Sequence, residues 1–139
     1  MSGFSRIFLD TAPIIYYVER KPQIFDKMLS FLRQNISADY VTSVVSIAEY
    51  FPYPFKQSNA NELIAEFERF VSQVDLSILD ITRTIAMKSA QIRSEYPHFK
   101  TMDSLQLAAA LSSHCDIFLT NDKQLRQFSE LPCIILDDC

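Results

Sequence analysis

Four acidic side chains stand where the sequence pattern predicts the end of a strand or the start of a helix: Asp10, Glu49, Asp103 and Asp122. Asp10 directly follows the apolar run 7–9, and Asp122 comes shortly after the apolar run 117–119. In parallel α/β sheets the carboxyl ends of the strands are where ligands bind, so acids there are poorly explained as solubilising surface. Several carboxylates in one crevice repel one another unless a cation holds them, and carboxylate with water suits Mg²⁺ or Mn²⁺. The sequence therefore predicts a divalent metal site.

Two of these acids also have an ordinary explanation. Asp103 is expected near a helix start, where its charge is favoured by the helix dipole, so it could act only as a helix stabiliser. Glu49 has apolar neighbours in sequence, including Val45 and Ile47. It is therefore either a buried functional group or part of a narrow exposed stripe, because unpaired acids are almost never fully buried. Both alternatives stay open at this point.

Short apolar runs alternate with amphipathic segments and predict the frame that positions the acids. Strands are expected at 7–9, 40–42, 76–79, 117–119 and 133–136, and helices at 24–36, 44–50, 63–74, 85–96 and 104–113. This alternation is typical of a parallel sheet covered on both faces. We therefore expect an α/β fold in which residues 1–139 form a single-domain α/β/α sandwich with a central parallel sheet of four to five strands.

Small polar residues and prolines predict several helix boundaries. Thr42 or Ser43 is available to cap the helix at 44–50, and Pro52 with Pro54 is expected to end it. Asp103 is expected to open the helix that follows it.

Length and composition indicate one globular domain. A chain of 139 residues with 48% apolar content can bury a sizeable core. No apolar stretch approaches the roughly 18 to 20 residues that a membrane span needs, and the N-terminus lacks the pattern of a signal peptide, so we expect a cytoplasmic location and no membrane partner. The three cysteines show no metal-ligand spacing, and their odd number argues against a disulfide framework. Cys115 and Cys133 are expected to be buried thiols.

The charge balance gives no sign of a broad nucleic-acid-binding face. With the four acids set aside, the formal net charge of −4 becomes zero. A protein that neutralises phosphates over a wide surface normally shows an excess of clustered Lys and Arg. A nucleic-acid role would therefore need local cations with metal ions, or the surface of a second subunit. Candidate base-stacking and phosphate-binding residues, each of which could equally be core or solvated surface, are Tyr16, Tyr17, Tyr50, Tyr53, Arg6, Lys56, Arg93 and Lys100.

Other functional classes fit the pattern less well. A metal-dependent phosphatase of the haloacid-dehalogenase type also has an Asp after its first strand, but it usually has a second acid where this chain has Ala12. A nicotinamide-binding enzyme would need a glycine-rich turn there, and Gly3 is the only glycine of the chain. A non-catalytic interaction module is the main alternative to an enzyme, since a fold can persist after its chemistry is lost.

Taken together, four short motifs resemble the PIN domain and, within it, the VapC-type ribonuclease toxins of toxin–antitoxin pairs. The motifs are Asp10-Thr11, Ser46-Ile47-Ala48-Glu49, Asp103-Ser104-Leu105-Gln106-Leu107-Ala108 and Leu119-Thr120-Asn121-Asp122. The likeness extends from Ile7 to about Leu136 and depends on the order and spacing of the motifs, because each is weak alone. The scarcity of glycine and the segment 53–56 depart from the commonest family pattern, which bears on substrate choice more than on chemistry.

The resemblance implies a metal-dependent endoribonuclease that hydrolyses RNA phosphodiester bonds as the toxin of a type II toxin–antitoxin pair. In the family, acids at the positions of Asp10, Glu49, Asp103 and Asp122 are catalytic and bind Mg²⁺ or Mn²⁺. Thr11, Thr120 and Asn121 match supporting positions, although Thr11 could instead bond a local backbone group and Asn121 could stabilise a turn. The implied partners are an RNA substrate, structured or in a single-stranded loop, a cognate antitoxin and a second copy in a homodimer, with 14–18 and 50–55 as candidate surfaces.

Overall fold

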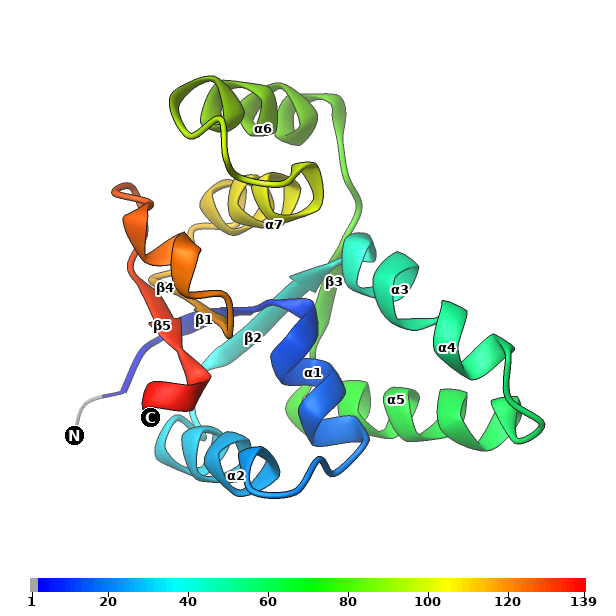
Figure 1. Cartoon of the computed structure of the whole chain (residues 1–139). Coiled ribbons are helices and arrows are strands. Elements are labelled where there is room, and N and C mark those ends of the chain that lie inside the picture. The colour runs from blue at the N-terminus through cyan, green and yellow to red at the C-terminus, as the bar shows by residue number, and fades with distance from the viewer. Residues whose placement is uncertain (1–2) are drawn as a thin grey trace.

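A computed structural model describes residues 3–139 and shows a five-stranded parallel sheet with helices on both faces (Figure 1). The strands are β1 (Arg6–Leu9), β2 (Asp39–Ser43), β3 (Ser77–Leu79), β4 (Ile117–Thr120) and β5 (Cys133–Ile135). The helices are α1 (Thr11–Val18), α2 (Ile24–Gln34), α3 (Val44–Tyr50), α4 (Pro52–Phe55), α5 (Ala60–Val74), α6 (Arg83–Glu95), α7 (Thr101–Ser112) and the 3-10 helices η1 (Lys123–Gln127) and η2 (Leu136–Asp138). The predicted α/β fold with a parallel sheet of four to five strands is confirmed.

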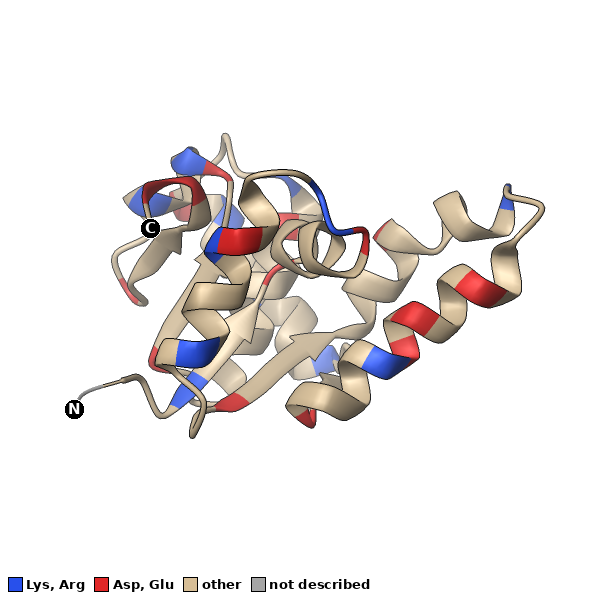
Figure 2. Ribbon diagram, turned by 90° about the horizontal axis from the view of Figure 1, so that it is seen from below, with Lys and Arg blue, Asp and Glu red and all other residues tan. Residues whose placement is uncertain are grey.

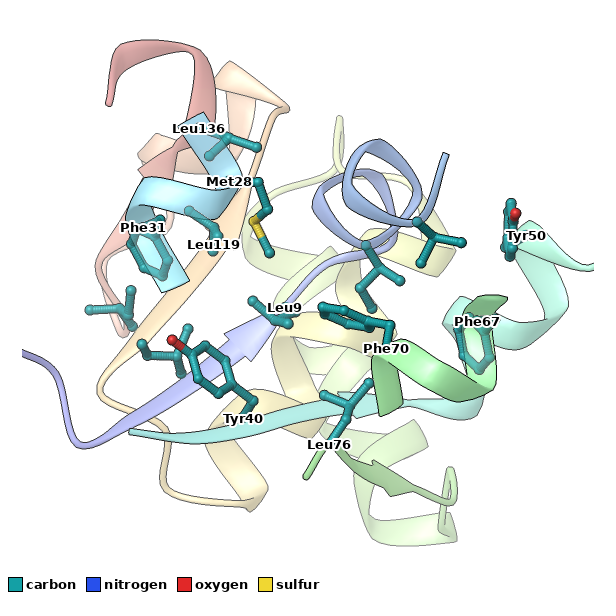
Figure 3. Packing of buried hydrophobic residues seen from close by; sticks show 14 residues of the cluster. Leu9, Met28, Phe31, Tyr40, Tyr50, Phe67, Phe70, Leu76, Leu119 and Leu136 are labelled. Carbon is teal, nitrogen blue, oxygen red and sulfur yellow. The ribbon is translucent and has the colours of Figure 1, made fainter. Parts of the chain in front are cut away.

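The central strand β1 shows why the sheet is covered on both sides. Ile7 and Leu9 pack with α1, α2 and α5 on one face, whereas Phe8 packs with α6 and α7 on the other. All three side chains are fully buried, and Phe8 stacks on Phe118 of β4 with ring centroids 5.3 Å apart. Successive strand residues point to opposite faces, so a strand buried on both sides is a continuous apolar run. Figure 3 shows the first of these clusters, in which Leu9 lies close to Phe70.

The strand order β3-β2-β1-β4-β5 places a topological switch at the centre of the sheet. The chain begins in β1, adds β2 and β3 on one side, and then returns to add β4 and β5 on the other. Leu9 of β1 is therefore paired with Leu119 of β4, although 110 positions separate them in the sequence. In open α/β sheets such a switch opens a crevice at the carboxyl ends of the strands, which is where ligands bind.

Two helical segments were not expected from the sequence. The segment Thr11–Val18 forms α1, and Asp10 is its N-cap. Helix α1 packs among other elements, and its residues are apolar on almost every side. Its sequence therefore lacks the polar stripe, repeated every three to four residues, that identifies an amphipathic helix. Pro52 and Pro54 were expected only to end α3; α3 does end at Tyr50, but Pro52 then starts α4, as suits a proline in a first helical turn.

Several smaller expectations are corrected. Helix α7 begins at Thr101, so Asp103 lies within its first turn instead of opening it. Ser43, and not Thr42, caps α3, because the Ser43 hydroxyl accepts a hydrogen bond from Val45 N at 3.1 Å. Helix α2 stops at Gln34, which leaves Ile36 81% exposed outside the helix.

The cysteines differ in their degree of burial. Cys115 is buried as expected, but Cys133 is only half-buried. Burial nevertheless raises the pKa of the Cys133 thiol to about 12, so this thiol is a weak nucleophile at neutral pH.

Within residues 3–139, none of the helices combines the length and the apolar character needed to cross a membrane.

Candidate active site

A cavity of about 360 Å³ opens at the carboxyl edge of the sheet, beside the switch between β1 and β4. All four predicted acids line it, although they come from four separate segments: the end of β1, helix α3, the first turn of α7 and the end of β4. The three predicted supporting residues line it as well. The full lining consists of Asp10, Thr11, Ala12, Ile15, Tyr16, Glu49, Asp103, Thr120, Asn121 and Asp122.

Asp10 lies at the bottom of this cavity and is only 7% exposed. One carboxylate oxygen accepts a hydrogen bond from Thr11 N at 2.9 Å, and the other accepts one from Thr120 Oγ1 at 2.8 Å. The pKa of Asp10 is raised to about 7, mainly by burial and to a smaller extent by the charges of Asp103 and Glu49, and the two hydrogen bonds act in the opposite direction. Near neutral pH a positive charge beside Asp10 would therefore favour its ionised form.

Asp103 also has a raised pKa, at about 6. Burial is the largest cause, followed by the charges of Asp122 and Glu49, while Lys100 acts in the opposite direction. The interaction among these acids shows that they share one electrostatic environment. The position of Asp103 in the first turn of α7 suits the helix dipole, and its position in the cavity lining also suits a ligand.

Two threonines connect the acids. Thr11 Oγ1 donates to Glu49 Oε1 at 2.6 Å, which joins the start of α1 to α3 and replaces the local backbone contact that was the alternative for Thr11. Thr120 Oγ1 donates to Asp10 and accepts a hydrogen bond from Asp122 N at 3.1 Å. Glu49 itself is exposed and lines the cavity. Of the two alternatives left open by the sequence, the exposed position is therefore correct and the buried one is wrong.

Asn121 lines the cavity, but its amide is bonded to the C-terminal segment. Its Nδ2 donates to Asp137 Oδ2 at 3.2 Å, and its Oδ1 accepts from Asp137 N at 3.0 Å. This pair of contacts supports the structural alternative for Asn121, with the C-terminal segment as its partner.

We expect Asn121→Ala to lower the free energy of unfolding by about 1 kcal/mol, because both hydrogen bonds to Asp137 are lost. Hydrogen exchange at the Asp137 amide should also become faster. Denaturant unfolding and exchange measured by NMR would check both effects. Gln124→Ala, at an exposed position on the neighbouring η1, is the control and should change neither. An Asp137 amide that exchanges at the wild-type rate in Asn121→Ala would contradict the prediction.

Four further polar residues lie beneath the cavity and were not predicted as part of the site. Thr42, Ser43, Ser46 and Gln106 are all at most 1% exposed. Gln106 contacts Ser46 and Ser43 through its amide, and Ser46 contacts Thr42. A signal for Gln106 was present in the sequence, because it follows Asp103 by about one helical turn and lies between the apolar residues Leu105 and Leu107.

The donor set of the cavity suits a hard divalent cation. Its candidate ligands are carboxylate oxygens, and within residues 3–139 none of the four acids forms an ion pair with Lys or Arg. In that same part of the chain, no three His, Cys, Asp or Glu side chains are grouped closely enough to hold one ion together. Mg²⁺ commonly takes only one or two carboxylates directly and keeps several waters. The residues therefore fit an ion that has few direct ligands and whose waters contact the remaining acids.

The predicted substrate-contacting residues divide into three groups. Tyr16 lines the cavity, whereas Tyr50 is buried in the core and Tyr17 is packed against the same cluster. Tyr53 is 50% exposed on α4. The prediction that Arg6 contacts a phosphate at the cavity was wrong, because Arg6 lies at the start of β1 and the cavity lies at the other end of that strand. There its Nε donates to Ser113 O at 2.7 Å.

Lys and Arg do not gather around the cavity. Figure 2 shows them on several elements, mixed with Asp and Glu, and α5 alone carries three Glu and one Arg. Lys100, which directly precedes α7, is the cation that acts on Asp103. This mixed distribution over residues 3–139 agrees with the neutral balance of the rest of the sequence.

A larger cavity of about 620 Å³ lies at another place, between the N-terminal segment, α2 and the C-terminus. Phe4 and Phe31 contribute to its lining, and Asp26 and Lys27 are its only acidic and basic residues. Its lining holds no group of carboxylates, and burial raises the pKa of its Cys139 thiol although Lys27 acts in the opposite direction. The smaller cavity at the switch is the better candidate for chemistry.

Comparison with known proteins identifies the same architecture. The sequence profile of the PIN domain matches residues 7–131. No significant match is found among curated proteins.

Several solved structures share the fold at low sequence identity. FitAcB from Neisseria gonorrhoeae is 20% identical, with a TM-score of 0.79 over 96% of this chain and 99% of that one. A toxin–antitoxin complex from Klebsiella pneumoniae is 18% identical, with a TM-score of 0.68 over 94% and 97% of the two chains. VapC20 from Mycobacterium tuberculosis, described as a toxin that cleaves the sarcin–ricin loop, is 12% identical, with a TM-score of 0.66 over 90% and 98%.

Proposed function

This chain belongs to the PIN-domain family, and from that premise we propose that it is a metal-dependent endoribonuclease that hydrolyses RNA phosphodiester bonds. The observation that carries the proposal is the convergence of four acids from four separate segments on one cavity. The proposed catalytic and metal-binding residues are Asp10, Glu49, Asp103 and Asp122, with Thr11 and Thr120 in supporting roles.

The proposed reaction is attack of a water molecule on phosphorus. A bond forms between the water oxygen and phosphorus, one ester P–O bond breaks, and the departing oxygen takes up a proton. A bound Mg²⁺ or Mn²⁺ would lower the pKa of the attacking water and neutralise charge on the phosphoryl oxygens.

The protein side chains would divide the work of holding the ion and its waters. Asp10 and Asp103 are the proposed direct ligands, because their raised pKa values reflect burial and mutual repulsion that a cation would relieve. Glu49 and Asp122 would accept hydrogen bonds from the waters of the ion. Thr120 would hold Asp10 and the backbone of Asp122 at a fixed separation.

RNA with accessible single-stranded bases or loops is the proposed substrate. Unstacked bases can lie on aromatic side chains, and Tyr16 is present at the cavity wall. A wide phosphate-binding surface is absent from the charge pattern of the described residues, so local contacts such as Lys100 would have to orient the strand.

We also propose that the chain is the toxin of a toxin–antitoxin pair, held inactive by a cognate antitoxin, and that it forms a homodimer. The likeness to the Klebsiella pneumoniae toxin–antitoxin complex supports the first part. Of the two candidate surfaces, 50–55 fits better, because Tyr53 and Phe55 are 50% and 68% exposed. In the segment 14–18, by contrast, Ile14 and Val18 are core residues.

The proposed activity predicts cleavage that depends on a divalent ion. We expect the purified protein to cut a mixed pool of structured RNAs in Mg²⁺ or Mn²⁺, to stop when a chelator is added, and to resume when the ion is restored. Asp103→Asn should lower the cleavage rate at least about 100-fold, because it removes a proposed ligand. Gel analysis of the RNA products would measure both effects.

The same experiment separates the enzyme from a non-catalytic module. In the described residues no three of the four acids are grouped closely enough to hold one ion together, and this observation favours the module. A protein that binds Mn²⁺ but leaves every RNA of the pool intact would support the module. Cleavage that continues at full rate in chelator would contradict the proposed metal chemistry.

A further inference from the structure

The buried polar cluster beneath the cavity joins the two helices that carry Asp103 and Glu49. Gln106 lies on α7 three residues after Asp103, and its side chain is fully buried. Its Nε2 donates to Ser46 Oγ at 2.9 Å, and its Oε1 accepts from Ser43 Oγ at 2.5 Å. Ser43 caps α3 and Ser46 lies within it, so one amide fixes α7 to the start of the helix that ends in Glu49 and Tyr50.

The directions of these hydrogen bonds follow from the chemistry of the groups. Thr42 Oγ1 donates its proton to Leu9 O at 2.8 Å, because a carbonyl can only accept. Thr11 Oγ1 likewise donates to Glu49. The Ser46 hydroxyl is therefore the only possible donor in its contacts with Thr42 at 2.8 Å and with Thr11 Oγ1 at 3.1 Å, and its one proton goes to one of the two. Ser46 has no second proton, so it accepts from Gln106.

The same reasoning fixes the orientation of the Gln106 amide. If the amide were turned over, Oε1 would face Ser46 Oγ, whose proton is already given to Thr42 or to Thr11. With Nε2 towards Ser46, the Ser43 hydroxyl can donate to Oε1 while it accepts from Val45 N. Every polar atom of the amide is then used in one arrangement.

The last step of the network reaches the cavity. Gln106 Nε2 lies 3.4 Å from Thr11 Oγ1, so its second proton faces that hydroxyl. Thr11 Oγ1 gives its own proton to Glu49 Oε1 at 2.6 Å. The hydrogen bonds therefore all point in one direction: Gln106 donates to Thr11, and Thr11 donates to Glu49 Oε1. The other carboxylate oxygen of Glu49, Oε2, is then left for a ligand.

We propose that Gln106 is a positioning residue for the acidic cavity: its amide sets the separation of α7 from α3 and, through Thr11, the orientation of the Glu49 carboxylate. The inference rests on the proposed function, because the task of the positioned carboxylates is to hold a divalent ion and its waters. Residues that orient ligands in this way commonly change metal affinity by about 10- to 100-fold when they are replaced.

A buried amide that serves only the stability of the core would behave differently, and the chain offers a matched control. Asn35 is also a buried amide, 7% exposed, and it lies away from the acids. Its Nδ2 donates to Phe31 O at 2.9 Å, and its Oδ1 accepts from Phe4 N at 3.1 Å. Gln106→Met and Asn35→Leu each replace a buried amide by an apolar side chain of similar shape.

Isothermal titration of the apoprotein with Mn²⁺ tests the inference without an activity readout. We expect Gln106→Met to raise the dissociation constant for Mn²⁺ about 10-fold, and Asn35→Leu to leave it within about twofold of wild type. Both variants should melt at a lower temperature, so melting alone would not distinguish them. Wild-type affinity in Gln106→Met would overturn the inference while leaving the proposed metal site intact. No binding of Mn²⁺ by the wild-type protein would overturn both.

A second pair of variants keeps the inference testable if Gln106→Met does not fold. Thr11→Val removes the hydroxyl that joins Gln106 to Glu49, whereas Thr11→Ser retains it. We expect about a 10-fold loss of Mn²⁺ affinity in the first and near wild-type affinity in the second. Equal affinities in the two variants would contradict the network. Where Gln106→Met folds, adding Thr11→Val to it should cause little further loss, because residues of one network are not additive.

Discussion

Asp10→Asn is expected to lower the rate of RNA cleavage at least about 100-fold while the protein stays folded. Asp10 is the most buried of the four acids and the proposed direct ligand at the bottom of the cavity. An amide in its place removes a negative charge but can still accept the hydrogen bond from Thr11 N. The loss should therefore reflect metal binding and transition-state stabilisation, and circular dichroism should be unchanged. Cleavage kinetics at saturating Mn²⁺ measure the effect.

Asp80→Asn is the matched control for this experiment. Asp80 directly follows β3 as Asp10 follows β1, yet it is exposed and does not line the cavity. We expect Asp80→Asn to cleave RNA at the wild-type rate. Wild-type cleavage by Asp10→Asn would remove the basis for the proposed active site, and an equal loss in both variants would show that the effect is not specific to the cavity.

The second large effect concerns the pH dependence of stability without metal. The pKa of Asp10 is about 7 in the folded protein against an ordinary value of 3.8. Between these values the folded state keeps a proton that the unfolded state has lost, so the free energy of unfolding falls as pH rises. From Asp10 alone, we expect the loss between about pH 4 and pH 7 to be about 3 kcal/mol. Asp103, whose pKa is raised to about 6, should contribute in the same direction.

Asp10→Asn should remove most of this pH dependence. In chelator at about pH 7.5, the variant is expected to melt about 10 °C above the wild type, whereas the two should melt close together at about pH 4.5. Thermal melts across this pH range would check the prediction. Parallel pH profiles for the two proteins would contradict the assignment of the effect to Asp10.

A divalent ion should narrow the difference in stability between the two proteins at about pH 7.5. An ion bound only by the folded state stabilises it by about 2.7 kcal/mol at a concentration of 100 times its dissociation constant. Wild type should therefore gain stability in Mn²⁺ at about pH 7.5, and Asp10→Asn should gain little. Binding should also release protons near neutral pH, because Asp10 must ionise to act as a ligand. Calorimetry in buffers of different ionisation enthalpy measures that release.

Most of the strands and helices could be predicted from local sequence patterns. The five strands were predicted within a few residues, and the clearest signals were the apolar runs of β1 and β4, because a strand buried on both faces must be a continuous apolar run. Helix α1 could not be predicted in the same way. Its residues are apolar on nearly all sides, so the sequence lacks the polar stripe that marks an amphipathic helix.

The candidate site depended more on long-range packing. The pattern of an apolar run followed by Asp occurs not only at Asp10 but also at Asp80 and at Asp137, which follow β3 and β5 closely. Strand order separates them, because β3 and β5 are edge strands while β1 and β4 are neighbours at the switch. The cavity of the four acids therefore exists only in the assembled sheet.

By itself, the sequence determined the fold class and the set of acids from which a site could be built, because hydrophobic periodicity and residue type act over a few positions. Only the tertiary structure decided which acids share a cavity, the raised pKa values of Asp10 and Asp103, and the amide network of Gln106. Gln106 and Thr11 are 95 positions apart, and a contact over that distance depends on the packing of whole helices against the sheet. Local propensity carries no information about such a contact, since burial and charge interaction arise only when the segments meet.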